Sequence, residues 1–243
     1  MRIHFLLIGA FACTITQAQQ FLSTGMIEYE VKVNNVKRMG DGIFANMLKD
    51  KIPQFSTYYY RMTFEEDKAI YKYDHKDETS KIPFFADNNL DDNIWFSDYS
   101  NSTFTNQKNV FGDIYLLSDS LMNIQWRMVP NETREIAGFV CRKAQAVIFD
   151  SVYVFAFYTD EITVPGGPMG IHGLPGMILG ITIPRMFSSW IADKVVINGV
   201  NTSIVAAPQK GKKKKATELL ENVKKVSKDW GSYGQQAIWQ LFL

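Results

Sequence analysis

Residues 139–159, FVCRKAQAVIFDSVYVFAFYT, decide the fold class of this chain. Segments 139–149 and 151–159 are rich in aliphatic and aromatic residues and flank Asp150, a pattern typical of a β-hairpin. In the second segment one face is aromatic and the other is small and aliphatic: Tyr153, Phe155 and Phe157 alternate with Val152, Val154 and Ala156. Because both faces are apolar, we predict a central strand that is covered on both sides.

Strand patterns recur along most of the chain. Alternating or aromatic-rich segments predict further strands at 27–33, 57–64, 68–73, 124–128, 177–183, 190–197 and 203–206. Turn residues separate them at intervals of roughly 8–15 residues, which is typical of antiparallel sheets. The predicted fold class is therefore mainly β, a curved or partly closed antiparallel sheet with a C-terminal amphipathic helix.

The C-terminal helix is predicted from apolar residues at helical spacing: Leu219, Leu220, Val223, Val226 and Trp230. Thr217 is the predicted N-cap, and Gly231 stands where a glycine would end the helix. Residues 207–215, which include four consecutive lysines, are interpreted as an exposed linker to this helix. Two weaker helical signals cover 42–51 and 235–242.

The N-terminus carries the pattern of a secretory signal. Arg2 supplies a positive charge, residues 3–13 are apolar apart from His4, and Thr16-Gln17-Ala18 is a cleavage sequence. The alternative is a membrane anchor, but the apolar stretch is shorter than the ~20 residues that cross a bilayer. We predict a signal peptide at 1–18, one domain at 19–243, and export to the periplasm, outer membrane or medium, without a later membrane span.

Charge and motifs restrict the classes of function. The chain of 243 residues has 26 basic and 25 acidic residues, so no overall positive field favours nucleic acid. Cys141 is the only cysteine after residue 18, and the two histidines there are His75 and His172. HExxH, CxxC and Gly-x-Ser-x-Gly do not occur, so we predict no metal, no cofactor and, on balance, no enzyme.

Two chemical alternatives involve Cys141. With His172 as base and Asp160 or Glu161 as orienting acid, its thiol would be the nucleophile of a hydrolase. With Met169, His172 and Met177, it would form a soft site for Cu(I). The structural interpretation of the same residue is a small buried hydrophobe.

A glycine- and proline-rich segment carries a family resemblance. Residues 173–178 read Gly-Leu-Pro-Gly-Met-Ile, and 158–162 and 166–168 read Tyr-Thr-Asp-Glu-Ile and Gly-Gly-Pro. With Gly138-Phe-Val-Cys-Arg-Lys-Ala144 upstream, this order and spacing resemble the GLPGLI family of exported Bacteroidota proteins. The chain departs from the family pattern at Met177, at Met169 and at Phe157. The resemblance implies a cell-envelope protein with a mainly β fold and implies no reaction.

The backbone of this segment has two interpretations. Pro175 fixes one φ angle and Gly176 allows a positive one, as in a type II turn. The segment is then either a structural turn that starts a core strand or a rigid loop at the mouth of a cavity.

The resulting functional hypothesis is a non-catalytic binding or carrier module for an apolar ligand or a peptide. Its predicted binding residues combine the aromatic strand, or the opposite face of that strand, with the motif loop: Tyr153, Phe155, Phe157, Met169, His172, Gly173, Leu174, Pro175 and Gly176. The alternative is an interaction partner of an outer-membrane machine, which would use exposed edge strands and the lysine-rich helix. A hydrolase that uses Cys141 is the third hypothesis.

Overall fold

The fold is taken from a computed structural model that describes residues 21–40, 46–47, 49–80, 92–149, 151–230, 234–235 and 238–239. The predicted signal peptide, half of the helical signal at 42–51, most of that at 235–242, and Gly231 lie outside the described residues. No helix of the described part is long and apolar enough to cross a membrane.

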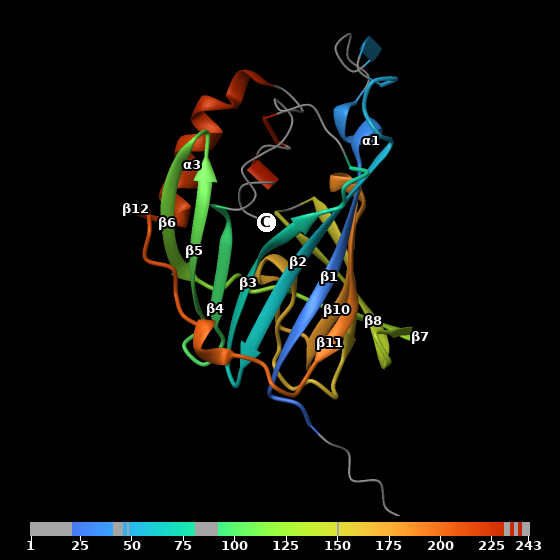
Figure 1. Ribbon diagram of the computed structural model, residues 1–243. Helices are drawn as coiled ribbons and strands as arrows, with labels where there is room; N and C mark the ends of the chain where they lie inside the picture. Colours follow the sequence, from blue (N-terminus) through green and yellow to red (C-terminus); the bar gives the residue numbers. More distant parts are fainter. Residues whose placement is uncertain are drawn as a thin grey trace, which may run out of the picture.

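One sheet of twelve strands forms the molecule (Figure 1). The strands are β1 (Thr24–Asn34), β2 (Phe55–Glu65), β3 (Lys68–Lys76), β4 (Ile94–Asp98), β5 (Thr103–Val110), β6 (Asp113–Ser120), β7 (Arg127–Ile136), β8 (Phe139–Ile148), β9 (Val152–Thr159), β10 (Met177–Ile183), β11 (Ser188–Val196) and β12 (Lys212–Lys215). Their spatial order is β12-β6-β5-β4-β3-β2-β1-β11-β10-β9-β8-β7, and the sheet does not close. The predicted fold class, a curved antiparallel sheet with a C-terminal helix, is confirmed.

The topology shows why the sheet must curve. Strands β1 to β6 form one meander and β7 to β11 form another, and the two join where β11 pairs with β1. Residues 121–126 connect β6 to β7, which are ten strand positions apart. On a flat sheet that separation would be about 48 Å at about 4.8 Å per strand. The connection reaches only about 25 Å when fully extended, so it runs across the concave side of a strongly curved sheet.

Two apolar clusters fill the concave side. The larger one covers β1, β2, β3 and β8 to β11, and its buried members include Tyr29, Met62, Val154, Leu174 and Ile181. The smaller one lies at the other end of the sheet, under α3 (Ala216–Val226), and consists of Val110, Leu117, Leu219, Val223 and Ile238. In Figure 1, α3 lies beside β5, β6 and β12, whereas β7 and β8 form the far side of the molecule.

Most predicted strands are confirmed, and several boundaries are corrected. The hairpin at 139–159 and the strands at 27–33, 57–64, 68–73, 177–183 and 190–197 correspond to β8–β9, β1, β2, β3, β10 and β11. The strand expected at 124–128 begins only at Arg127. The strand expected at 203–206 is wrong, because Asn201 accepts a hydrogen bond from the Ser203 N–H and caps a 3₁₀ turn, η5 (Thr202–Ile204). Strands β4, β5 and β6 and helix α1 (Asn35–Met39) were not predicted.

The C-terminal region differs from the predicted linker and cap. The four lysines of β12 are mostly exposed, as predicted, but they pair in parallel with residues 115–118 of β6 and so form a strand instead of a linker. Helix α3 therefore begins at Ala216, and Lys215, not Thr217, is its N-cap residue, without a side-chain cap. The apolar stripe is confirmed at Leu219 and Val223, which are buried, while Val226 is 63% exposed.

Candidate functional site

A pocket of about 230 Å³ opens on the concave side of the sheet. It lies where β4, β5 and β6 meet the connection 121–126, the β8–β9 turn, the motif loop and the start of α3. Its lining residues are Ser97, Phe104, Asn106, Asp119, Ser120, Leu121, Met122, Ile124, Ile148, Phe149, Met169, Gly170, Ile171, Ala216, Thr217 and Leu220. Segments more than one hundred residues apart in the sequence thus build one cavity.

The pocket exists because the two apolar clusters do not meet. Ile148, Met169 and Ile171 belong to the larger cluster and line one wall. Phe104 and Leu220 pack against the smaller cluster and line the opposite wall. The curved sheet holds both walls, and the side chains of neither cluster fill the space between them.

The lining is mostly apolar, with a few polar groups. Asn106 is engaged, because its Oδ1 accepts a hydrogen bond from the Phe96 N–H at 3.1 Å. Asp119 is engaged through one oxygen only, since its Oδ1 accepts from the Ser120 N–H at 2.9 Å. The Asp119 Oδ2 atom is buried and has no hydrogen-bond partner among the described residues. A mostly apolar cavity with few polar groups is the usual form of a site for a small organic ligand.

The motif loop, residues 165–176, is mostly buried, with Gly173 and Pro175 exposed, and also supplies one wall of this pocket. The Gly173 N–H donates to Pro165 O at 3.1 Å and the Ile178 N–H donates to Gly166 O at 2.8 Å, so the loop is held at both ends. Its 3₁₀ turn η3 (Pro168–Gly170) presents Met169 to the pocket. Of the predicted motif residues, Met169 lines the pocket, whereas Leu174 is 1% exposed within the larger cluster.

Gly176 has the positive φ that its motif predicts. Its φ is 136°, and a Cβ atom there would lie 2.0 Å from Thr159 O. The Met177 N–H donates to Ile162 O at 3.0 Å, and the Gly176 N–H donates to Leu174 O at 2.7 Å. The hydrogen bond that closes this turn joins residues two apart, Leu174 and Gly176, and not residues three apart as in a type II turn. Pro175 and Gly176 therefore have a structural role at the start of β10.

His172 lies behind the pocket wall. The Trp126 Nε1–H donates to His172 O at 2.8 Å, and the His172 Nδ1 lies 2.9 Å from Gly170 O. Burial lowers the pKa of His172 below its ordinary value of 6.5, and the Gly170 carbonyl opposes this shift. The imidazole is therefore neutral at pH 7, and Trp126 ties the connection 121–126 to the motif loop.

The predicted aromatic strand lies on the other face of the sheet. Val152 and Val154 of β9 are buried on the concave side, so the alternate residues Tyr153, Phe155 and Phe157 lie on the other face. Phe155 and Phe157 are half-buried there, and Phe157 packs against the larger cluster. Tyr153 is 54% exposed, and the expectation that this strand is covered on both sides is wrong there. Tyr153 has a cross-strand partner on this face, Val147, and such pairs stabilise aromatic side chains at exposed strand positions. Of the three aromatic residues, Phe157 packs against the cluster that contains Met169 and Leu174, whereas Tyr153 and Phe155 are not among its members.

Cys141 has the environment of a buried hydrophobe. It is 0% exposed, and its Sγ donates weakly to Phe139 O at 3.6 Å. Burial, with a smaller contribution from Glu161, raises the pKa of its thiol to about 12. A nucleophilic cysteine needs a lowered pKa and some exposure, which Cys141 lacks. Within the described ranges, no three His, Cys, Asp or Glu side chains gather as metal ligands would.

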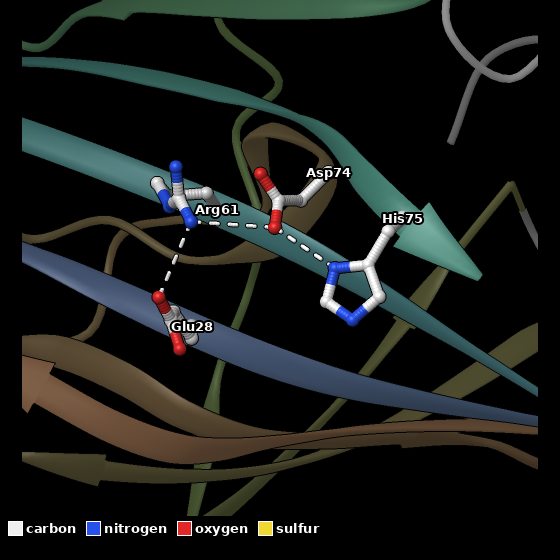
Figure 2. A network of polar contacts seen from close by, with 4 residues as sticks. All are labelled: Glu28, Arg61, Asp74 and His75. Carbon is white, nitrogen blue, oxygen red and sulfur yellow. Dashed lines mark hydrogen bonds and ion pairs between the residues drawn. The ribbon is translucent and has the colours of Figure 1, made fainter. Parts of the chain in front are cut away.

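A network of charged residues covers the outer face of β1, β2 and β3 (Figure 2). Arg61 lies 3.3 Å from both Glu28 and Asp74, and Asp74 in turn contacts the His75 Nδ1 at 2.9 Å. Tyr59 stacks on the His75 ring, with centroids 4.4 Å apart. These side chains are partly exposed, and ion pairs at such positions contribute little to stability. Their charged groups are paired with one another and not directed at a ligand. The network is the polar surface of a half-buried sheet.

Comparison with known proteins shows similarity at the level of fold. The sequence matches no family model and no curated protein. A solved structure of PNGF-II in space group P21 matches with a TM-score of 0.52, 16% identity and 82% of this chain. Another PNGF-II structure, in space group C2, gives a TM-score of 0.51, 16% identity and 89% coverage. An uncharacterised conserved protein from Thermus thermophilus gives a TM-score of 0.40, 6% identity and 80% coverage of this chain against 91% of its own.

The chain spans about a third of PNGF-II, 33% in one structure and 32% in the other. At 16% identity this likeness concerns the fold alone.

The pocket residues beyond the motif loop were not found from the sequence. Leu220 and Phe104 resemble any apolar core residue there, and Asp119 stands in a polar stretch without a motif.

Proposed function

We propose that this protein is an exported, non-catalytic binding module whose concave-side pocket holds a small apolar ligand. The observation that carries the proposal is the mostly apolar cavity between the two clusters, lined by the motif loop on one side and α3 on the other. The buried, protonated thiol of Cys141 supports a binding role over a hydrolase.

The size of the pocket restricts the ligand. Drug-sized molecules occupy pockets of about 300–1,000 Å³, and this cavity of about 230 Å³ is smaller. Burial of one methylene group contributes about 0.8 kcal/mol, which corresponds to about a fourfold gain in affinity. A short alkyl chain or a compact ring is therefore the ligand body that the pocket supports.

Two features of the sequence support the location in the cell envelope. Residues 1–18 have the pattern of a cleaved signal peptide, and the segment around 173–178 resembles the GLPGLI family. A binding module in that compartment would carry or retain an apolar molecule outside the cytoplasm.

Calorimetric titration of the purified protein with hexanol, heptanol and octanol tests the proposal. We expect the affinity to rise about fourfold with each methylene until the pocket is full. Leu220→Trp places a larger side chain on the pocket wall and should reduce octanol affinity about five- to 150-fold, since overpacking costs about 1–3 kcal/mol. Val226→Trp makes a similar substitution on the exposed side of the same helix and is the matched control.

Affinity that is flat across the alcohol series would contradict a filled apolar pocket. An equal effect of Leu220→Trp and Val226→Trp would place the binding elsewhere. Circular dichroism of both variants establishes that they fold.

The open edge of the sheet favours a second candidate, an interaction partner of another envelope protein. β7 ends the sheet, so one side of its backbone has no neighbouring strand among the described residues, and nearly all its side chains are exposed. Such an edge accepts an added strand. A photo-crosslinker at Glu135 should then capture a partner in intact cells, whereas one at Glu28, within the polar network, should not. Equal capture at both positions would count against this candidate.

A further inference from the structure

We propose that the pocket selects a ligand with a cationic hydrogen-bond donor, such as an alkylammonium head group, and that Asp119 receives it. This inference rests on the proposed function, because it assigns the polar end of the same ligand whose apolar body fills the pocket.

The position of Asp119 follows from the register of β5 and β6. Asp119 pairs with Phe104 across the two strands, and both side chains line the pocket. Leu117, two residues earlier on β6, is 2% exposed in the cluster under α3. Residues two apart on a strand share a face, so Asp119 also points to the concave side.

The carboxylate has an acceptor that nothing in the described part satisfies. Its Oδ1 accepts from the Ser120 N–H, but its Oδ2 is buried without a partner. A buried polar atom without a hydrogen bond is costly, and a carboxylate oxygen more so. A donor supplied by the ligand would remove that cost, and only the ligand-bound state would gain from it.

Three lysine side chains of the neighbouring strands are engaged elsewhere. Lys212 pairs with Asp113 and Lys214 pairs with Glu218. Lys108 lies four residues beyond Phe104 on β5, about 13 Å along the strand, with its Nζ 3.6 Å from the centre of the Trp95 ring. Asp119 takes part in no ion pair found among the described residues, so its charge is available to a cationic ligand.

The surroundings suit an ammonium group rather than a second acid or a plain alcohol. An ammonium ion has three donors. Asp119 would accept one of them, and Ser97 and Thr217, which also line the pocket, carry hydroxyl groups that can accept others. The Cβ–Cγ torsion of an aspartate is soft, so the carboxylate can reorient when a donor enters the pocket.

Another role for Asp119 makes a different prediction. Lys215 of β12 pairs with Ser118, so the uncapped start of α3 lies beside Asp119. A negative charge near a helix N-terminus is stabilising. In that case Asp119→Asn would lower the stability of the protein and would leave its preference among head groups unchanged.

The test compares octylamine, which is protonated at pH 7, with octanol and octanoate at physiological ionic strength. For the unmodified protein we expect octylammonium to bind about ten- to hundredfold more tightly than octanol, as for one hydrogen bond to a charged group, and octanoate to bind most weakly. Asp119→Asn keeps the size of the side chain and should bring the amine to within about threefold of the alcohol. Asp113→Asn, an exposed position on the same strand, should preserve the wild-type preference.

Equal affinity of the unmodified protein for amine and alcohol would overturn the role of Asp119 without any variant. An amine preference that survives Asp119→Asn would also overturn it. In both cases octanol binding that is sensitive to Leu220→Trp would leave the proposed function intact. Absence of octanol binding would instead remove the proposed function itself.

Discussion

The close approach of Gly176 to β9 makes Gly176→Ala the sharpest test of the motif loop as a structural element. A Cβ atom at this position would lie 2.0 Å from Thr159 O and 2.9 Å from Asp160 Cα. Both obstacles are backbone atoms of the neighbouring strand end and cannot rotate away as a side chain can. The substitution must therefore separate the start of β10 from the end of β9.

The expected cost has two parts. A non-glycine residue at φ 136° costs about 1–3 kcal/mol from the backbone angle alone. Separation of the strands also weakens the bond from the Met177 N–H to Ile162 O and the pairing of Met177 with Thr159 at the start of β10, at about 1 kcal/mol each. Together these effects predict a loss of about 3–5 kcal/mol, which is a large part of a typical stability of about 5–15 kcal/mol.

Gly199→Ala is the matched control. Gly199 also has a positive φ, 70°, but no heavy atom lies within 4 Å of a Cβ built there. It should cost about 1–2 kcal/mol. Urea unfolding followed by tryptophan fluorescence measures both variants, and a difference of about 2 kcal/mol corresponds to about 4–8 °C in Tm. If both substitutions cost the same, the close backbone contact at Gly176 does not exist.

Three further predictions concern buried polar groups. Cys141 should resist iodoacetamide at pH 8 in the folded protein, because burial raises the pKa of its thiol to about 12. It should react once urea unfolds the chain. Rapid labelling of the folded protein, measured by mass spectrometry, would contradict this. Folding lowers the pKa of His172, so the unfolded state binds the proton more readily and stability should fall as the pH drops below 6.5. His172→Gln should flatten that part of the plot of unfolding free energy, measured in urea, against pH. An unchanged plot would refute the pKa shift. Tyr29→Phe removes the buried bond from its hydroxyl to Ile178 O at 2.7 Å and should cost about 1–3 kcal/mol, whereas Tyr153→Phe on the open face should cost less than about 0.5 kcal/mol; equal costs in thermal unfolding would count against the bond.

Strands with strong periodicity could be predicted from the sequence. Which face of each strand is buried could not. The β8–β9 hairpin was predictable because aliphatic and aromatic residues alternate around Asp150. Since both faces of β9 are apolar, the pattern did not show that Val152 is buried and Tyr153 is open to solvent. That assignment depends on which side the sheet curves toward, which is a property of the whole sheet and not of β9 alone.

β12 shows how tertiary context overrides a local signal. Four consecutive lysines have low strand propensity and predict a solvated linker. They form a strand because the edge of β6 offers a parallel partner, and because Lys212 pairs with Asp113 at 2.9 Å. The lysines also leave this edge of the sheet charged, which disfavours pairing with another chain.

The pocket was the least predictable feature. Its walls come from strands, turns and a helix between Ser97 and Leu220, and Met169 is the only predicted binding residue among them. A cavity is space that two apolar clusters leave open, so no residue type marks it in the sequence. Leu220 and Ile171 have the same pattern as residues that are fully packed.

The most direct test of the account is amide chemical-shift mapping of the ¹⁵N-labelled protein during titration with octanol. The account predicts saturable shifts at the pocket walls, at Leu121, Met169, Ile171 and Leu220, with little change at Tyr153 and Phe155 on the outer face. Shifts confined to the outer face of β9, or no saturable shifts at all, would contradict a ligand site between the two apolar clusters.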